Sequence, residues 1–577
     1  MSKEAATLPV ADRSRVLIAI LIGCAAFFLF LRSGNFAFLN YDDNDYVTGN
    51  AMIQRGLGID TIVWAFTTGH ASHWHPLTWL SHALDWSLFG DAPRGHHLTN
   101  VILHAVNSVL LFFALQRLTR EVWLSACVAM LFAVHPMNVQ SVAWIAERKN
   151  VLSTFFGWLC LYFYAGYLEK QTRARMAGVA AILALGLMSK AMLVTWPMLL
   201  LLIDWWPARR MKAVLTNPKD LFYESRRPAL EKLPLLALVV LSSVVTYIAM
   251  RSYGAIGVET SYPLNVRLQN VAVSYVAYLE KLFVPFGLAP FYPHPLDALP
   301  AWKVVACTLF LLLLTVIVIR RGQSQPYLAF GWFWYVGTLV PVIGFVQAGE
   351  QAMGDRYAYV PYVGLFVALV WGGRDVAKMF SIPPRVTGIV FSAAILLLCA
   401  RSLNELGTWR NDVTLWEHAV AVTDNNYIAH QNLGVAYRGQ RRKEDATAQF
   451  EAALRIRPAH ARSLVNMGTL LLDAGKHEEG MDYLMSAVQH APNNAPAQLN
   501  LGMGYVRGGD VEKGLEHLLA AIELTPHDYR LTNLVGSVYA RNGQQSEARH
   551  WFEESLRINP GYEKAIVNLR VLSDSGG

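Results

Sequence analysis

Long apolar runs alternate with short polar segments through the first 400 residues of this 577-residue chain. The runs fall near 15–32, 97–116, 121–138, 151–168, 176–190, 193–206, 233–250, 302–320, 327–346, 357–372 and 386–402. Most of them approach the roughly 20 residues that an α-helix needs to cross a bilayer. The pattern predicts about 11 spans. The first run could pass for a signal peptide, but no convincing small-residue cleavage site follows it, so we expect it to be retained as a membrane span.

The basic residues of the loops predict how these spans are oriented. Residues 207–232 carry seven Lys and Arg against three acids, and such loops face the cytoplasm. We therefore expect a cytoplasmic N-terminus, an outer loop at 34–96, and a chain that emerges on the outer face at residue 403. This orientation requires the apolar stretch 271–286 to lie at the interface or to re-enter, and not to cross.

The last 175 residues repeat with a period of 34. Prolines fall at 458, 492, 526 and 560, and glycines at 434, 468, 502 and 536. This is the tetratricopeptide period, with small residues where paired helices touch and a proline that ends the second helix. It predicts repeats at 427–460, 461–494, 495–528 and 529–562, a half-repeat at 409–421 and a closing helix at 563–573. The chain is thus expected to be all-α, with a membrane domain at 1–402 and an α-solenoid at 403–577.

Composition and charge support this division. Hydrophobic residues make up 54% of the chain and charged residues 16%, against about 25% charged in soluble domains. These values exclude a disordered chain and a wholly soluble enzyme. The net charge of +7 divides into +11 over residues 1–402 and −4 over 403–577. The five cysteines all lie in apolar stretches and predict no disulfide framework or metal cluster.

An acidic pair, Asp42 and Asp43, directly follows the first predicted span on the outer side. Such a pair can serve as a general base, with one carboxylate taking a proton while the other positions it. The alternative is an ordinary polar loop start, where Asp and Asn are common.

Cations border the membrane on the same predicted side, at Arg148, Lys149, Lys190 and Arg356. Arg and Lys neutralise the charge on a leaving phosphate, so these residues are candidates for binding a lipid phosphate. The alternative is that they anchor head groups or pair with Glu147 and Asp355.

Polar residues also fall within apolar segments. His97, Asn100 and His104 share one face of a predicted helix, and polar groups in a span face a cavity or the bundle interior. They either line a cavity or tie helices together. The histidines at 70, 73, 75, 96 and 97 fit no compact ligand motif, so no metal site is predicted.

The predicted repeats carry asparagines in one register, at Asn432, Asn466, Asn500 and Asn568. Asparagine amides on a concave surface can pair with the N–H and C=O groups of an extended peptide. The alternative is hydrogen bonding between repeats.

In combination these features resemble the transmembrane and tetratricopeptide-repeat O-mannosyltransferases, and more broadly the GT-C class of polytopic glycosyltransferases. The matching segments, in order along the chain, are Tyr41-Asp-Asp, His75-Pro-Leu, His97 to His104, Leu131 to Pro136, Ser141 to Leu152, Ser189-Lys190, Asp355 to Pro361 and the repeats. The chain departs from the family pattern at Gln140, Ala191 and Asp355, where the family usually has Glu.

The resemblance implies transfer of a hexose, with mannose expected, from a polyprenyl phosphate sugar to Ser or Thr hydroxyls of an exported protein, with inversion. Asp42 or Asp43 would be the base, and the four cations would hold the phosphate. The residues expected to line the cavity are His75, His97, Asn100, His104, His135 and Glu147. No cofactor, divalent metal or nucleic acid is expected.

The expected partners are the bilayer, the lipid-linked sugar and a polypeptide held by the repeats. The expected location is a bacterial inner membrane, or the ER membrane in a eukaryote, with the repeats on the exoplasmic side. Two alternatives remain: a non-catalytic membrane scaffold for envelope or secretion assembly, and a GT-C enzyme with a glycan or lipid acceptor.

Overall fold

The computed structural model describes residues 10–211, 218–252, 262–347 and 349–574. The chain forms two compact units that divide between Thr423 and Asp424. The predicted division lay at residue 403. Helix α17 (Asp412–Val422), expected to be a half-repeat, therefore belongs to the first unit.

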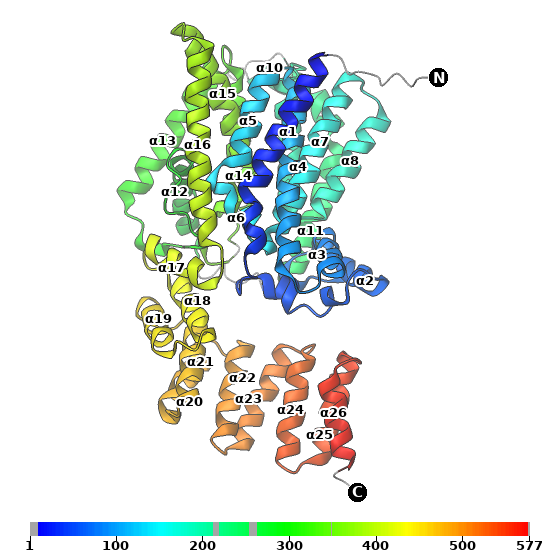
Figure 1. Ribbon diagram of the computed structural model, residues 1–577, viewed down its shortest axis with the longest axis vertical. Coiled ribbons are helices and arrows are strands. Elements are labelled where there is room, and N and C mark those ends of the chain that lie inside the picture. Colours follow the sequence, from blue (N-terminus) through cyan, green and yellow to red (C-terminus); the bar gives the residue numbers. More distant parts are fainter. Residues whose placement is uncertain (1–9, 212–217, 253–261, 348, 575–577) are drawn as a thin grey trace. The chain divides into compact units, whose positions relative to one another are not determined.

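The first unit is a bundle of helices (Figure 1), several of which expose large hydrophobic side chains. Its longer helices are α1 (Val10–Phe30), α4 (Pro93–Thr119), α5 (Val122–Val134), α7 (Arg148–Glu169), α8 (Arg173–Leu187), α9 (Trp196–Trp205), α11 (Leu233–Ser252), α12 (Leu264–Phe283), α13 (Ala301–Arg321), α14 (Pro326–Leu339), α15 (Pro361–Met379) and α16 (Pro384–Thr408). The shorter elements include α2 (Ile59–Thr67), α3 (Pro76–Phe89), α6 (Val139–Ala143) and α10 (Pro218–Glu231). Two short antiparallel strands, β1 (Tyr292–Pro293) and β2 (Gln351–Met353), pair beside them.

Among the described residues, six helices are long and apolar enough to cross a membrane. They lie at Arg13–Asn35, Pro93–Thr119, Ile145–Glu169, Leu233–Arg251, Ala301–Arg321 and Pro384–Thr408. A seventh span results if α5 and the helical segment Pro136–Ala143, bent by 56°, count as one. The predicted count of about 11 is not confirmed, because several apolar runs form helices of only 10 to 15 residues, namely α8, α9 and α14.

Helix α12 contains most of the apolar stretch 271–286, and the predicted orientation of the membrane spans requires that this stretch does not cross the bilayer. Near its start the Asn270 amide donates to Ala352 O (2.9 Å), and near its end Leu282 O lies 3.1 Å from His135 Nε2. The segments that carry Ala352 and His135 meet at one end of the bundle, where Gln140 Oε1 accepts a hydrogen bond from Arg356 N. Two points of α12, Asn270 in its second turn and Leu282 in its last, therefore contact the same end of the bundle.

Close helix packing depends on small residues and on buried amides. A Cβ on Gly331 of α14 would lie 2.3 Å from Gly364 O of α15, so only glycine allows these two backbones to approach so closely. Between α4 and α7, Asn107 donates to Val151 O (2.8 Å). Such contacts bring the helix ends, and the loops that they carry, into a fixed arrangement.

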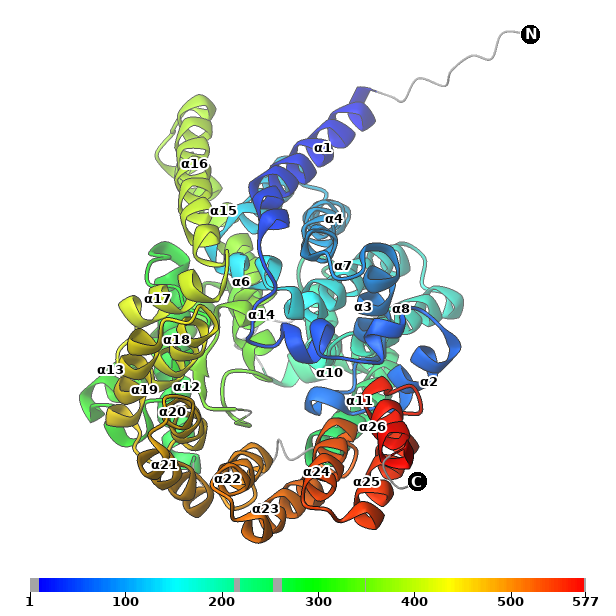
Figure 2. The ribbon, with the colours of Figure 1, turned by 60° about the horizontal axis from the view of Figure 1, so that its bottom comes forward.

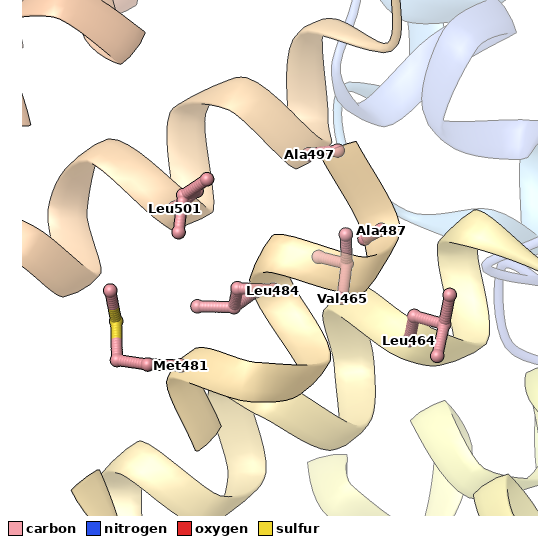
Figure 3. Packing of buried hydrophobic residues seen from close by; sticks show 7 residues of the cluster. All are labelled: Leu464, Val465, Met481, Leu484, Ala487, Ala497 and Leu501. Carbon is pink, nitrogen blue, oxygen red and sulfur yellow. The ribbon is translucent and has the colours of Figure 1, made fainter. Parts of the chain in front are cut away.

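The second unit consists of helix pairs. They are α18 (Tyr427–Gly439) with α19 (Lys443–Ile456), α20 (Ala461–Asp473) with α21 (His477–His490), α22 (Ala495–Arg507) with α23 (Val511–Leu524), α24 (Tyr529–Arg541) with α25 (Gln545–Ile558), and a final α26 (Glu563–Asp574). Figure 2 shows the successive pairs following a curve. Leu484 and Leu501 belong to the core between the second and third pairs (Figure 3). Each helix pair buries its apolar face against its neighbours, as expected for a solenoid.

Candidate active site

Three cations converge on one buried carboxylate at one end of the first unit. Glu147, only 1% exposed, has carboxylate oxygens 3.2 Å from Lys190 Nζ, 3.4 Å from Arg356 Nε and 3.6 Å from Lys149 Nζ. One negative charge thus faces three positive charges. Buried charges need compensation, so this cluster of Lys149, Lys190, Arg356 and Glu147, called the cation cluster below, favours the binding of an anion.

Separate segments supply the members of the cation cluster. Lys149 lies in the first turn of α7, where free N–H groups and the helix dipole also favour an anion. Lys190 directly precedes the short helix η7 (Ala191–Thr195), and Arg356 lies in η10 (Asp355–Ala358). The cluster therefore exists only when three distant parts of the chain are folded together.

Aromatic rings and amides hold the cations in place. Lys149 Nζ donates to Tyr46 Oη (3.0 Å), and the Arg356 guanidinium lies 4.6 Å from the Tyr357 ring centroid. Lys190 Nζ also donates to Asn150 Oδ1 (3.3 Å). Cation–π contacts stabilise a positive charge without neutralising it, so the cluster keeps its net charge.

The two adjacent aspartates have different surroundings. Asp43 is fully buried, and its carboxylate accepts hydrogen bonds from Leu39 N (2.8 Å) and Ala146 N (3.0 Å). Asp42 is partly exposed, and among the described residues no hydrogen bond reaches its carboxylate. Asp43 therefore ties its loop to the segment before Glu147, whereas Asp42 has a carboxylate that is free to accept a proton.

The ionisation of these groups follows from burial and from nearby charges. Burial raises the pKa of Asp42, while Lys149 and Arg356 counteract the rise. Burial raises the pKa of Asp43 to about 7 against the lowering effect of its two backbone hydrogen bonds. Burial lowers the pKa of Lys190 to about 8, although Glu147 acts in the opposite direction. Lys190 is thus charged at neutral pH and loses its proton in mildly alkaline solution.

The structure does not bring Arg148 into the cation cluster. Its guanidinium is buried and donates to Asp85 Oδ2 (2.7 Å), Ser81 Oγ (2.8 Å) and His96 O (2.8 Å). Arg148 therefore joins α3 and α4 to the start of α7. Its neighbour Lys149 points elsewhere, because consecutive helical residues differ by about 100° in direction.

The predicted cavity residues take several roles. Asn100 donates to Trp144 O (2.9 Å), and His104 pairs with Tyr359 Oη (2.7 Å) and Ala133 O (3.1 Å). His97 Nε2 lies 3.5 Å from Ala37 O, and His135 Nε2 lies 3.1 Å from Leu282 O. Asn100, His97, His104 and His135 thus tie segments together, and Glu147 alone of the predicted cavity residues is a member of the cation cluster.

His75 lies beside the cation cluster. Its ring is 5.6 Å from that of Tyr46, which contacts Lys149, and 4.6 Å from that of Trp79. Its buried Nε2 has no hydrogen-bond partner among the described residues. A nitrogen in this state is available to a bound ligand or to water.

Sequence reasoning did not single out Tyr46, Asn150 or the role of Gln140. Gln140 donates to Pro290 O (3.0 Å) and accepts from Arg356 N (2.8 Å). This side chain is both donor and acceptor, which explains how an amide is accommodated where the resemblance leads one to expect Glu. The only sequence signal was the departure from the family pattern itself.

The aligned asparagines of the repeats divide into two groups. Asn500 Oδ1 accepts a bond from Thr469 of the preceding repeat (3.4 Å), and Asn568 donates to Asn533 Oδ1 (3.0 Å). Asn432 and Asn466 are partly exposed on their helices. Hydrogen bonding between neighbouring helix pairs, the alternative to peptide binding, thus applies to Asn500 and Asn568.

No group of three or more His, Cys, Asp or Glu among the described residues is arranged to hold a metal ion. The positive charges of the candidate site come from the side chains of Lys149, Lys190 and Arg356.

The fold and the site describe a multi-pass, all-α membrane protein with a tetratricopeptide array and a cationic site at one end of its bundle. A family model described as tetratricopeptide repeat matches residues 432–495 and 499–563, which confirms the predicted repeats. Among solved structures, a tetratricopeptide protein titled YrrB covers 29% of this chain and 84% of its own at 22% identity, with a TM-score of 0.24.

Curated relatives confirm the resemblance seen in the sequence. A protein O-mannosyl-transferase of Caenorhabditis elegans is 22% identical over 457 residues, 74% of this chain and 60% of the relative. A human protein O-mannosyl-transferase is 22% identical over 451 residues, 72% of this chain and 48% of its own length. A Drosophila melanogaster relative of the same name is 30% identical over 161 residues, 26% of this chain and 18% of its own. The chain spans about half the length of the curated relatives it matches.

Proposed function

We propose that this protein is a membrane O-mannosyltransferase that transfers mannose from a polyprenyl phosphate sugar to Ser or Thr hydroxyls of a polypeptide. One observation carries the proposal. Asp42, with a carboxylate free to accept a proton, lies in the electrostatic field of Lys149 and Arg356, two of the three cations that share Glu147. A base and an excess of positive charge are what transfer from a sugar phosphate requires.

In the proposed mechanism, Asp42 takes the hydroxyl proton as the acceptor oxygen attacks the anomeric carbon. The bond from that carbon to the phosphate oxygen breaks, and the leaving phosphate keeps the electron pair. The cations Lys149, Lys190 and Arg356 stabilise the charge that develops on it. A single displacement inverts the anomeric centre. The side-chain cations supply the positive charge, so the proposal includes no metal or cofactor.

The proposal extends to location and partners. The basic loop 207–232 supports a cytoplasmic position for that loop. The opposite end of the bundle, which carries the cation cluster, would then face the exoplasmic side of a bacterial inner membrane or of the ER membrane. We propose that the repeats are exoplasmic as well. The repeats would present the polypeptide acceptor, as such arrays commonly bind extended segments.

The test uses purified full-length protein in lipid nanodiscs, a labelled polyprenyl phosphate mannose and a Ser/Thr-containing polypeptide. We expect label in the wild-type product, with inverted anomeric configuration by NMR, and loss of transfer in Asp42→Asn. Parallel reactions with glucose donors and with glycan or lipid acceptors define the sugar and the acceptor. If folded wild-type protein transfers no sugar to any acceptor, the enzyme proposal is wrong and the scaffold alternative is favoured.

A further inference from the structure

We propose that helix α17 forms part of the wall of the candidate active site, and that its residues Asp412 and Trp416 position the loop that carries Asp42. This inference rests on the proposed function and names positioning residues for the same site. Helix α17 is the last element of the first unit, and only four residues separate it from the first repeat helix, α18. From the sequence it was expected to be part of the repeats.

Backbone hydrogen bonds join the loop to the start of α17. Asn40 N donates to Asp412 Oδ1 (2.8 Å), and Ala37 N donates to Arg410 O (3.1 Å). These two donors come from the segment that connects α1 to Asp42. The contacts bridge more than 370 residues of sequence, so they fix the loop relative to a distant part of the chain.

The start of α17 is itself well defined. Asn411 Oδ1 accepts a hydrogen bond from Thr414 N (3.0 Å), and Asn411 N donates in return to Thr414 Oγ1 (3.3 Å). This reciprocal pair is a capping box, which fixes the first turn of a helix. Asp412 is therefore held by a rigid helix end while it accepts the hydrogen bond from the loop.

Aromatic side chains extend the contact toward the reacting groups. Trp416 is 1% exposed, and its ring meets that of Tyr41 edge to face, with centroids 5.0 Å apart. Tyr41, the residue before Asp42, stacks on Trp144 with centroids 4.6 Å apart and an interplanar angle of 11°. Aromatic pairs of these geometries are attractive, so Trp416 holds Tyr41 against Trp144.

The same stack reaches the cation cluster. The Trp144 ring lies 5.5 Å from the Arg356 guanidinium and 5.9 Å from Lys149 Nζ. One series of rings, from Trp416 through Tyr41 to Trp144, thus sets the separation between the proposed base and two proposed phosphate ligands. Transfer depends on this separation, because a small displacement of a reacting group lowers the rate steeply.

The experiment compares full-length variants in the transfer assay. Trp416→Ala is expected to lower kcat by about 10- to 100-fold, with a smaller effect on the KM of the donor. Trp416→Phe retains a ring and should keep most of the activity. The matched control is Trp302→Ala, because Trp302 is 72% exposed on α13 and takes no part in the site.

Asp412 provides a second, independent pair of variants. Asp412→Ala removes the acceptor for Asn40 N and is expected to lower kcat, whereas Asp412→Asn retains an acceptor oxygen and should restore most of it. A merely structural loss would reduce the amount of active protein without altering the pH dependence. We expect the acid limb of kcat/KM in Trp416→Ala to move to lower pH, because greater exposure of Asp42 to water weakens the effect of burial that raises its pKa.

The outcomes separate this inference from the proposed function. If wild-type protein transfers sugar and both alanine variants match Trp302→Ala in kcat and pH profile, the inference is wrong. If wild-type protein transfers nothing, the proposed function fails, and hydrogen exchange of residues 37–46 decides the inference. Faster exchange in Trp416→Ala than in Trp302→Ala then supports it, and equal exchange overturns it. If Trp416→Ala does not fold, Asp412→Ala compared with Asp412→Asn and Trp302→Ala decides the inference by the same measurements.

Discussion

Asp42 and Asp43 are adjacent in the chain, yet within the described part of the chain only the Asp43 carboxylate accepts hydrogen bonds, from Leu39 N and Ala146 N. The Asp42 carboxylate is partly exposed and lies in the field of Lys149 and Arg356. The pair thus divides its roles: one aspartate holds the loop and the other is available for chemistry.

The first prediction separates these two roles. Asp42→Asn is expected to lower kcat by about 10²- to 10⁴-fold, as for loss of a general base, without a change in thermal stability. Asp43→Asn places an amide N–H against a backbone N–H, so it should lower both the melting temperature and the activity. Transfer assays and thermal unfolding of both variants check this. An active Asp42→Asn beside an inactive but stable Asp43→Asn would reverse the assignment.

The second prediction concerns pH. Burial lowers the pKa of Lys190 to about 8, so this cation is present below pH 8 and is lost as the pH rises through that value. The kcat/KM for the donor, which reports the free enzyme, should therefore fall above about pH 8. The kcat should fall less, because a bound phosphate keeps Lys190 protonated.

Lys190→Arg tests the cause of this alkaline limb, because arginine stays charged throughout the range. We expect the limb to move to higher pH or to disappear. Lys170→Arg is a suitable control, since Lys170 is an exposed residue after α7. An unchanged limb in Lys190→Arg would show that another group titrates there.

The repeats were predictable because their signal is local and periodic. The sequence predicts a repeat from 427 to 460, and the structure has α18 and α19 between Tyr427 and Ile456. The spans were less predictable, because an apolar run does not define where its helix begins. The run at 193–206, for example, starts as the 3-10 helix η7 and becomes the helix α9 only at Trp196.

The candidate site was predictable in its residue types but not in its grouping. Lys149, Lys190 and Arg356 stood out as outer-face cations, but their convergence on Glu147 depends on contacts between segments far apart in sequence. Arg148 was grouped with them because it too is a cation at the predicted outer border of the membrane. The rotation of the helix sends it to Asp85 instead, and no sequence pattern indicated that partner.

The third prediction follows from this difference between neighbours. Arg148→Ala leaves the buried Asp85 without its arginine partner, which should lower stability by about 3–5 kcal/mol. Lys149→Ala removes one of three cations from Glu147 and should chiefly raise the KM for the donor. Thermal unfolding and donor titration of the two variants give the comparison. A stable Arg148→Ala with a raised donor KM would place Arg148 among the phosphate ligands.

The fourth prediction concerns the departure at Gln140. Gln140→Glu keeps the acceptor for Arg356 N but replaces the donor to Pro290 O with a second oxygen. Loss of this buried hydrogen bond should cost about 1–3 kcal/mol in stability, and the added negative charge near Arg356 should raise the KM for the donor. The KM should recover at lower pH as the glutamate is protonated. Wild-type stability and donor affinity in this variant would contradict the role assigned to the amide.

The fifth prediction tests the packing of the repeats. A Cβ on Gly468 would lie 2.7 Å from Gly480 O, so Gly468→Ala must push α20 away from α21. The expected cost is about 1–3 kcal/mol. Gly439→Ala in α18 is the matched control, since nothing lies within 4 Å of its added Cβ. Alanine is also the better helix former, by about 1 kcal/mol, so the control should be neutral or stabilising. Limited proteolysis of the two full-length variants should show faster cleavage within 461–494 for Gly468→Ala alone, and equal cleavage would contradict the close approach of these helices.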